Sequence, residues 1–375
     1  MTSFLRSRQM RDADHVMILA MVGIAVFGMV TLRSIPGADF HRQTLLFAVG
    51  VLFFLAAASI DYGWLRHSWQ PLYWVTLSVL VVVLVFGRVV FGGKSWIALG
   101  PVQLQPSEFA KVVLMVCLAV YAAEAGSQIR DALELSFSFV SLVLPIFALI
   151  MAQRDLGTAL VILAIWMGVM YFAGANLWHL AAFVVGCMVV AKLGWDHGIV
   201  PQYRIFRILA WLHPREYLDP DASYGMPGMQ YLQAWRAIGS GGIWGQGYGN
   251  GQLTQFGRVP EQATDMTFSA LGEELGFVGC AVLVILYGIV IWRGVNTIAQ
   301  TQHDLGRYIA AGVVSYLAFE VLVSISMNVG LLPITGIPLP LFSRGGSNLI
   351  STMIAMGLLV NVHLRRRRIT FEAAT

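Results

Sequence analysis

The fold of this chain is decided by residues 135–194, which read LSFSFVSLVLPIFALIMAQRDLGTALVILAIWMGVMYFAGANLWHLAAFVVGCMVVAKLG. A helix that crosses the hydrocarbon core of a bilayer needs about 20 predominantly apolar residues. The stretch holds three apolar runs close to that length, separated by the polar insert Gln153-Arg154-Asp155 and the turn Gly174-Ala175-Asn176. It therefore predicts three membrane-spanning helices in succession: 135–152, 157–174 and 177–194.

The composition of the whole chain points the same way. Of its 375 residues, 57% are hydrophobic and only 12% are charged, and the mean hydropathy is +0.71. Because soluble domains carry about 25% charged residues, an ordinary soluble domain is excluded, and so is a disordered chain of high charge. The sequence predicts an integral membrane protein that forms a single polytopic membrane domain over residues 1–375.

Ten stretches of the chain are long and apolar enough to cross a membrane. None shows the period-two alternation of a transmembrane β-barrel strand, so an all-α bundle of about ten transmembrane helices is predicted. The predicted spans are 15–32, 44–60, 71–91, 107–123, 135–152, 157–174, 177–194, 266–292, 306–328 and 346–363.

The arginines at the two ends of the chain predict its orientation. Arg6, Arg8 and Arg11 precede the first span, and the run 365–368 follows the last. Lys and Arg collect on the cytoplasmic side of a membrane, so both termini are predicted to be cytoplasmic, as an even number of spans requires. We interpret the arginine run as an anchor to membrane lipids and not as a nucleic-acid site.

This orientation places the longest connection, residues 195–265 between spans seven and eight, on the extracytoplasmic side. Its segment PQYRIFRILAWLHP is amphipathic, which is typical of a helix in the membrane interface, and a second short segment, MQYLQAWRAI, follows. Seven glycines lie between Gly239 and Gly251, and we expect a mobile loop there.

Several chemistries lack their sequence patterns. The three cysteines show no CxxC spacing, the eight histidines show no HExxH motif, and neither GxxxxGK[ST] nor GxSxG is present. Once these classes of site are excluded, the remaining candidate chemistry is that of carboxylate side chains at the membrane.

Charged residues at span ends mark candidate sites, since such groups are costly in a bilayer. Glu108 and Lys111 open the fourth span, Arg154 and Asp155 lie between spans five and six, and Asp265 opens span eight. All of them fall on the predicted outer face. So does the apolar loop GLLPITGIPLPLFSRGGS after span nine, whose Pro and Gly residues exclude a helix; such backbone lines a cavity or is buried in protein.

Ordinary structural explanations remain open for each of these residues. Glu108 suits a first helical turn and can pair with Lys111 at i, i+3, and Asp265 can be an N-cap. Arg154 and Asp155 can form a solvated turn. A polar stripe in span nine, Glu320, Ser324 and Asn328, fits helix packing as well as substrate contact.

Three segments resemble one family. They are QPSEFAKV (105–112), VPEQATDMTFSALGEELGFVG (259–279) and MNVGLLPITGIPLPLFSRGGSNLISTMIAMGLLVNV (327–362). Together they resemble the SEDS family, the shape, elongation, division and sporulation glycosyltransferases that include RodA and FtsW. The run AIGSGGIWGQGYGNG and the sequence TGIPLP are similar to the RodA-like, rod-shape-determining members and less similar to the FtsW-like ones.

The resemblance implies a ten-helix peptidoglycan glycosyltransferase of cell wall biogenesis, serving cell shape, elongation or division. It implies that the enzyme polymerises lipid II at the outer face of the cytoplasmic (inner) membrane, with inversion and release of undecaprenyl pyrophosphate. The family's essential acid falls on Asp265. Its other motif positions imply substrate-binding roles for Glu108, Lys111, Asp155, Arg154, Glu261 and Thr264.

The family pattern is not matched everywhere. Arg154 stands where proline is usual, Ala263 where histidine is common, Met266 replaces an aromatic residue, and Arg344 replaces a tyrosine. None of these departures removes a carboxylate.

In the implied mechanism Asp265 is the base that deprotonates the acceptor hydroxyl. Lys111, Arg154 or a divalent cation (Mg or Mn) neutralises the departing pyrophosphate; the ligands of such a metal are unknown. The expected partner is a class B penicillin-binding protein, a transpeptidase.

The alternative function is a lipid II flippase or a proton-coupled transporter that uses the same carboxylates. Transporters often show inverted repeats and a site near the middle of the membrane. Here no internal repeat is evident and the charges gather at one face, which favours the enzyme.

Overall fold

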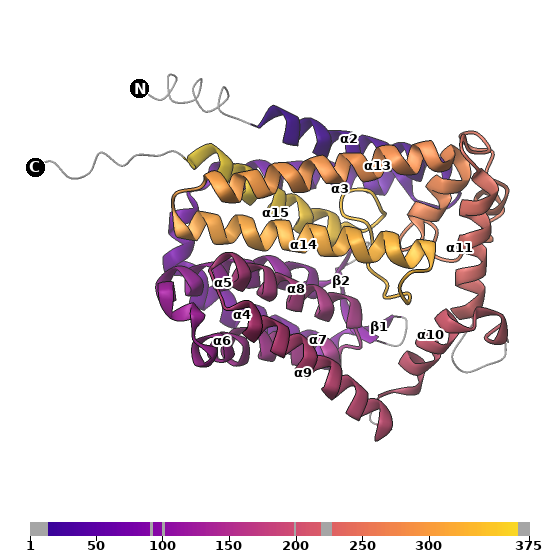
Figure 1. Ribbon diagram of the computed structural model, residues 1–375. Coiled ribbons are helices and arrows are strands. Elements are labelled where there is room, and N and C mark those ends of the chain that lie inside the picture. The colour runs from indigo at the N-terminus through magenta and orange to yellow at the C-terminus, as the bar shows by residue number, and fades with distance from the viewer. Residues whose placement is uncertain (1–13, 91–92, 100–101, 199, 219–226, 367–375) are drawn as a thin grey trace, which may run out of the picture.

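The computed structural model describes residues 14–90, 93–99, 102–198, 200–218 and 227–366, which form a bundle of long, roughly parallel helices (Figure 1). The apolar helices of the bundle are α2 (His15–Ser34), α3 (Phe40–Ser59), α4 (Leu65–Phe86), α5 (Pro106–Ala125), α6 (Ala132–Ser138) with α7 (Leu144–Ala152), α8 (Leu156–Phe172), α9 (Leu177–Asp196), α13 (Thr267–Gln300), α14 (Asp304–Val329) and α15 (Gly346–Arg365).

All ten predicted spans correspond to helices of the bundle. Within the described residues nine helical stretches are long and apolar enough to cross a membrane, α6 and α7 together counting as one. The tenth, α8, is also apolar but has only 17 residues. The prediction of a multi-pass helical membrane protein is therefore confirmed.

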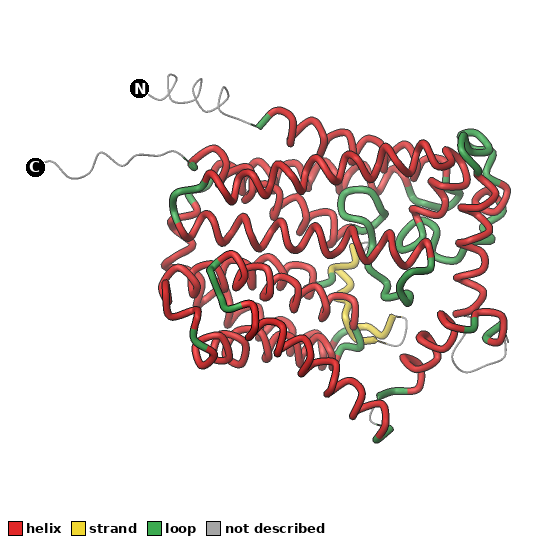
Figure 2. Tube along the Cα trace, viewed as in Figure 1, coloured by secondary structure: helices red, strands yellow, loops and turns green. Residues whose placement is uncertain are grey.

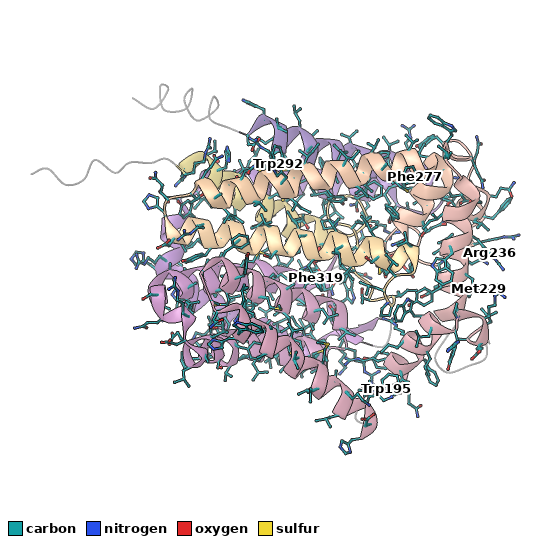
Figure 3. All side chains as sticks on the ribbon, in the orientation of Figure 1. Trp195, Met229, Arg236, Phe277, Trp292 and Phe319 are labelled. Carbon is teal, nitrogen blue, oxygen red and sulfur yellow. The ribbon has the colours of Figure 1, made fainter. Side chains whose placement is uncertain are left out.

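Burial separates the centre of the bundle from its periphery. Most of the membrane-spanning part of α5, α14 and α15 is buried, whereas only 11% of that part of α3 and 6% of that of α9 are buried. The exposed side chains are themselves apolar: Phe277 and Trp292, on the outward face of α13, are 69% and 60% exposed (Figure 3). Such a surface suits lipid and is unlike that of a soluble protein.

Two of the long helices are interrupted. A π-helical turn, Phe139–Val143, joins α6 to α7 just before Pro145, whose missing N–H disturbs the regular hydrogen bonding. In α13 the interruption lies at Gly276, which has φ 64° and ψ −162°. The first two turns of α13 are therefore set apart from its long membrane-spanning part.

The predicted C-terminal boundary of the third span, 71–91, is wrong. α4 ends at Phe86, and the chain continues into a three-stranded antiparallel sheet formed by β1 (Arg88–Val90), β2 (Gly93–Leu99) and β3 (Val102–Leu104). In this sheet Arg88 pairs with Trp96, and Ile97 pairs with Leu104. A short apolar run cannot by itself distinguish a helix from a strand, and Val89 and Val90 are β-branched residues that suit a strand.

The sheet lies at the opposite end of the bundle from the start of α2 and the end of α15 (Figures 1 and 2). We call it the sheet end. The long connection between α9 and α13 lies there too and contains α10 (Gln202–Leu212), α11 (Pro227–Gly241) and α12 (Gln252–Gln255). The two amphipathic segments predicted in this connection correspond to α10 and α11.

Candidate active site

A cavity of about 320 Å³ opens at the sheet end of the bundle. Its walls come from segments far apart in the sequence: residues 95–96, 105, 108, 153–156, 158, 161, 207, 230, 260–261, 264–266, 320, 334–338 and 344–348. The loop between α14 and α15, predicted either to line a cavity or to be buried in protein, supplies 334–338 and 344–345. Tertiary packing thus brings together the three charged clusters that the sequence placed on one face.

Four helices begin at this cavity. The first residues of α5, α8, α13 and α15 all lie at or next to its wall. The N-cap residues of α5, α13 and α15, namely Gln105, Met266 and Gly345, make no side-chain capping bond. Helix N-termini carry partial positive charge and unpaired N–H groups, so their convergence favours an anionic ligand.

Asp265 lines the cavity immediately before α13, and its carboxylate accepts no hydrogen bond from the described residues. It is not an N-cap, because Met266 occupies that position. Its backbone carbonyl accepts a bond of 2.9 Å from Asn328 Nδ2, which fixes the position of the residue from α14. Burial first, and the negative charge of Glu261 next, raise the pKa of Asp265 to about 7, against the opposing effect of Arg207. A carboxylate with these properties is available as a general base.

Asp155 is held far more tightly. It is the N-cap of α8, where Oδ1 accepts from the Thr158 N–H at 3.0 Å and Oδ2 accepts from Thr158 Oγ1 at 2.7 Å. Gln105 Nε2 donates to the same Oδ2 at 2.9 Å, and Ser107 Oγ lies 3.4 Å from it. Burial nevertheless raises the pKa of Asp155, although the bonds from Thr158 oppose the shift. This side chain joins the start of α8 to the start of α5.

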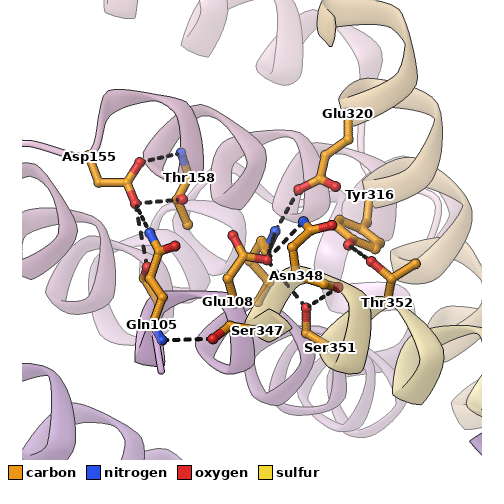
Figure 4. A network of polar contacts seen from close by, with 12 residues as sticks. Gln105, Glu108, Asp155, Thr158, Tyr316, Glu320, Ser347, Asn348, Ser351 and Thr352 are labelled. Carbon is orange, nitrogen blue, oxygen red and sulfur yellow. Dashed lines mark hydrogen bonds and ion pairs between the residues drawn. The ribbon is translucent and has the colours of Figure 1, made fainter. Parts of the chain in front are cut away.

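Glu108 and Lys111 form the ion pair that their spacing predicted. Lys111 Nζ lies 2.8 Å from Glu108 Oε2 and 2.5 Å from Glu320 Oε1, and all three side chains are buried. Asn348 Nδ2 also donates to Glu108 Oε2, at 3.0 Å (Figure 4). Glu108 and Glu320 line the cavity, whereas Lys111 lies behind them. The lysine is therefore engaged by two carboxylates and is poorly placed to neutralise a leaving group.

Arg154, Glu261 and Thr264 lie at the rim of the cavity. The exposed guanidinium group of Arg154 lies 5.8 Å from the centre of the Tyr203 ring of α10, so this turn is not simply solvated. Its φ of 65° is closed to proline, which stands here in the family pattern. Thr264 Oγ1 donates to Glu261 Oε2 at 3.0 Å, in the turn that leads to Asp265.

Two cations of the cavity were not identified as site residues from the sequence. Arg207 looked like a polar residue of an interfacial helix, yet it lines the cavity and its Nη1 reaches the carbonyl of Ile334 at 3.5 Å. Arg344 looked like a departure from a motif, yet it also lines the cavity, and its backbone N–H donates to the Ala263 carbonyl at 2.8 Å. Only their basic character gave a sequence signal.

The glycine-rich segment is a packed element and not the expected mobile loop. Its backbone bonds to both sides of the break in α13: Gln246 N donates to the Glu273 carbonyl at 2.9 Å, and Phe277 N donates to the Gly242 carbonyl at 2.9 Å. A Cβ atom at Gly276 would lie 2.3 Å from the Gly245 nitrogen, so the glycines permit close backbone contact. Residues 239–251 do not line the cavity.

The described part of the chain contains no group of three or more His, Cys, Asp or Glu side chains placed to hold a metal ion. The carboxylates of the cavity are instead engaged by Thr158, Lys111 and other protein donors, or stand alone. The residues present therefore do not form a ready site for the divalent cation considered from the sequence, and no step below is assigned to one.

The fold and the cavity define a class: a multi-pass helical membrane protein with an anion-attracting, carboxylate-bearing cavity at one end. Comparison with known proteins then gives the family. The model of the FtsW/RodA/SpoVE cell cycle proteins matches residues 10–368, and the chain belongs to this family.

Relatives of several kinds match over most of their length. Stage V sporulation protein E of Bacillus subtilis (strain 168) is 35% identical over 329 residues, which is 86% of each protein. A probable peptidoglycan glycosyltransferase FtsW of Geobacter sp. (strain M18) is 31% identical, over 96% of this chain and 99% of the relative. The peptidoglycan glycosyltransferase MrdB of Escherichia coli (strain K12) is 31% identical over 95% of both.

A solved structure also matches. It is described as "Structural coordination of polymerization and crosslinking by a peptidoglycan synthase complex", and the aligned chain is 30% identical, with a TM-score of 0.78. The match covers 95% of this chain and 99% of the other. The fold is therefore shared across nearly the whole length of both chains.

Proposed function

We propose that this protein is a peptidoglycan glycosyltransferase that polymerises lipid II into glycan strands and releases undecaprenyl pyrophosphate. Membership of the family and the curated names of its relatives support this activity. The observation in this chain that carries the proposal is Asp265, an acid whose carboxylate has no hydrogen-bond partner among the described residues and which lines a cavity where four helices begin.

In the proposed reaction Asp265 accepts the proton of the acceptor sugar's 4-hydroxyl. The hydroxyl oxygen then forms a bond to the anomeric carbon of the donor. The bond from that carbon to the pyrophosphate oxygen breaks, and its electron pair leaves with the pyrophosphate. One such displacement converts an α-linked donor into a β-linked product. The pKa of about 7 suits this task, because the carboxylate is well populated at neutral pH and is still basic.

The departing pyrophosphate needs positive charge. The three arginines of the cavity, Arg154, Arg207 and Arg344, and the helix N-termini provide it. We assign this role to them and not to Lys111, which two carboxylates already engage.

The remaining candidate residues shape the substrate site. Glu108 and Lys111 hold one wall in place, Asp155 ties α5 to α8, and Glu261 and Thr264 position the turn before the base. Their contact with substrate is part of the proposal.

We further propose that the chain is of the RodA-like type, that it acts as one domain, and that the sheet end faces outward with both termini in the cytoplasm. The rod-type motifs and the arginine clusters at the termini support these points. A class B penicillin-binding protein is the proposed partner, which agrees with the similar structure being that of a peptidoglycan synthase complex.

The decisive experiment is polymerisation of fluorescent lipid II by the purified protein in detergent. Glycan polymer is the expected product. If the protein instead moves lipid II across the bilayer of proteoliposomes and makes no polymer, the flippase alternative is correct.

A further inference from the structure

Glu320 is a buried acid that the mechanism above does not use. It lies in α14 with a relative exposure of 1%, and it lines the cavity. Its Oε1 lies 2.5 Å from Lys111 Nζ, but its Oε2 has no hydrogen-bond partner within the part of the chain that the structure describes. Figure 4 shows the carboxyl group reaching from α14 toward Glu108, with only one of its oxygens joined by a dashed line. A buried carboxylate oxygen without a donor is costly.

The charges around Glu320 do not balance if every acid is ionised. Five carboxylates line the cavity, against three arginines, and Lys111 behind the wall adds one more positive charge. The sum is one negative charge too many, in a site whose helix N-termini attract an anion.

The contacts indicate which acid carries the compensating proton. Glu108 Oε2 accepts from Lys111 at 2.8 Å, from Asn348 at 3.0 Å and from Ser351 at 3.3 Å, so its charge is well stabilised. Asp155 accepts from Thr158 and Gln105.

Among the described residues, the ammonium group of Lys111 is the donor that meets hydrogen-bond geometry at Glu320, and Glu320 shares it with Glu108. The Tyr316 hydroxyl, which bonds Thr352 Oγ1 at 2.6 Å, is the other polar group that acts on Glu320. One ammonium neutralises one carboxylate. Asp265, the other lining acid without a donor, is less deeply buried, and it titrates near neutral pH.

The titratable groups that face Glu320 from the elements packed around it leave this assignment unchanged. They are Lys111 and Glu108 of α5, Asp155 at the start of α8, Tyr287 of α13 and Tyr316 of α14, while α15 contributes the neutral Asn348 and Thr352. Lys111 is the only cation among them, and its Nζ also lies 4.8 Å from the centre of the Tyr316 ring.

We propose that Glu320 is held in its protonated, neutral form, and that its Oε2 hydroxyl donates a hydrogen bond to a phosphate oxygen of the lipid-linked sugar diphosphate in the cavity. The ligand named here rests on the proposed function. A carboxylate at this position would repel the diphosphate, whereas a carboxylic acid donates to it and adds no charge to the buried wall.

The first test is the pH dependence of lipid II polymerisation. The protein's kcat/KM is expected to fall on the alkaline side as Glu320 loses its proton. In Glu320→Gln, whose amide donates at every pH, this alkaline fall is absent while the acid-side rise due to Asp265 remains. Glu320→Met, which has no donor, loses about 10- to 100-fold in kcat/KM, and Glu320→Gln recovers most of that loss.

The second test does not depend on activity. Infrared spectroscopy of the purified protein near neutral pH is expected to show a carboxylic-acid C=O component that is lost in Glu320→Gln, while the component from Asp265, whose pKa is about 7, remains. The control is Glu261→Gln, which removes an exposed carboxylate and leaves the band in place.

An alkaline fall that persists unchanged in Glu320→Gln, an inactive Gln variant, or an acid band unaffected by this substitution would each overturn the proposal. If the protein makes no polymer at all, the proposed function fails, and the infrared band still decides the protonation of Glu320.

Discussion

Replacing Asp265 by Asn tests the role of a cavity carboxylate that has a pKa of about 7 and accepts no hydrogen bond from the described residues. The amide has the same size as the carboxyl group, and the bond that positions the residue, from Asn328 Nδ2, goes to its backbone carbonyl. The substitution therefore removes the base and leaves the packing intact. Loss of a positioned general base costs ~10²–10⁴ in rate, which is about 2.7–5.5 kcal/mol of barrier.

Asp155→Asn is the matched control, because Asp155 lies in the same cavity but is fully engaged. Its Oδ1 accepts one bond and its Oδ2 accepts from Thr158 Oγ1 and Gln105 Nε2. An amide nitrogen placed at either oxygen faces a donor, and a lost bond of this kind costs about 1–3 kcal/mol. The expected result is a lower melting temperature and a smaller loss of rate than for Asp265→Asn.

The assay is the initial rate of glycan formation from fluorescent lipid II, together with thermal unfolding of each variant in the same detergent. The two substitutions should give opposite profiles: Asp265→Asn stable and inactive, Asp155→Asn less stable and partly active. If Asp265→Asn keeps a rate within tenfold of that of the unmodified protein, Asp265 is not the base. If the inactive Asp265→Asn protein is also unfolded in the thermal assay, the inference that the substitution leaves the packing intact is wrong.

Three further results are expected. Below pH 7 the rate should fall about tenfold per pH unit, because protonation of Asp265, whose pKa is about 7, removes the base; a flat acid profile would argue against this. Gly276→Ala should lower the free energy of unfolding by about 2 kcal/mol or more, because the φ of 64° and the close contacts at this position disfavour a Cβ atom. Gly288→Ala in the same helix is the control, since a Cβ atom there meets no atom within 4 Å and should be tolerated. Equal melting temperatures of the two variants would contradict this. The orientation can be tested with single cysteines in a cysteine-free background and an impermeant thiol reagent applied to intact cells. The reagent should label Asn250→Cys, at the sheet end, and should not label Gln302→Cys, between α13 and α14. The reverse labelling pattern would show that the proposed orientation is inverted.

The sequence by itself was sufficient for the membrane bundle and for most of the candidate acids. Ten apolar stretches predict ten helices because backbone groups in lipid must bond within their own segment, so length and hydropathy decide the element. Charges at helix ends stand out against that background because they are costly there. Glu108, Asp155 and Asp265 were found in this way, before any contact was known.

Tertiary structure decided which of these residues stand free and which are engaged. Lys111 and Arg207 have the same charge, yet Lys111 is held by two carboxylates from α5 and α14 while Arg207 faces the cavity from α10. The glycine-rich segment docks on the broken helix α13, and Glu320 is left with one unpaired oxygen. These outcomes depend on contacts between residues far apart in the sequence, 209 positions for Lys111 and Glu320 and 27 for Gln246 and Glu273. Local periodicity does not encode such contacts, because pairing and desolvation are set by the side chains that the folded bundle places next to one another.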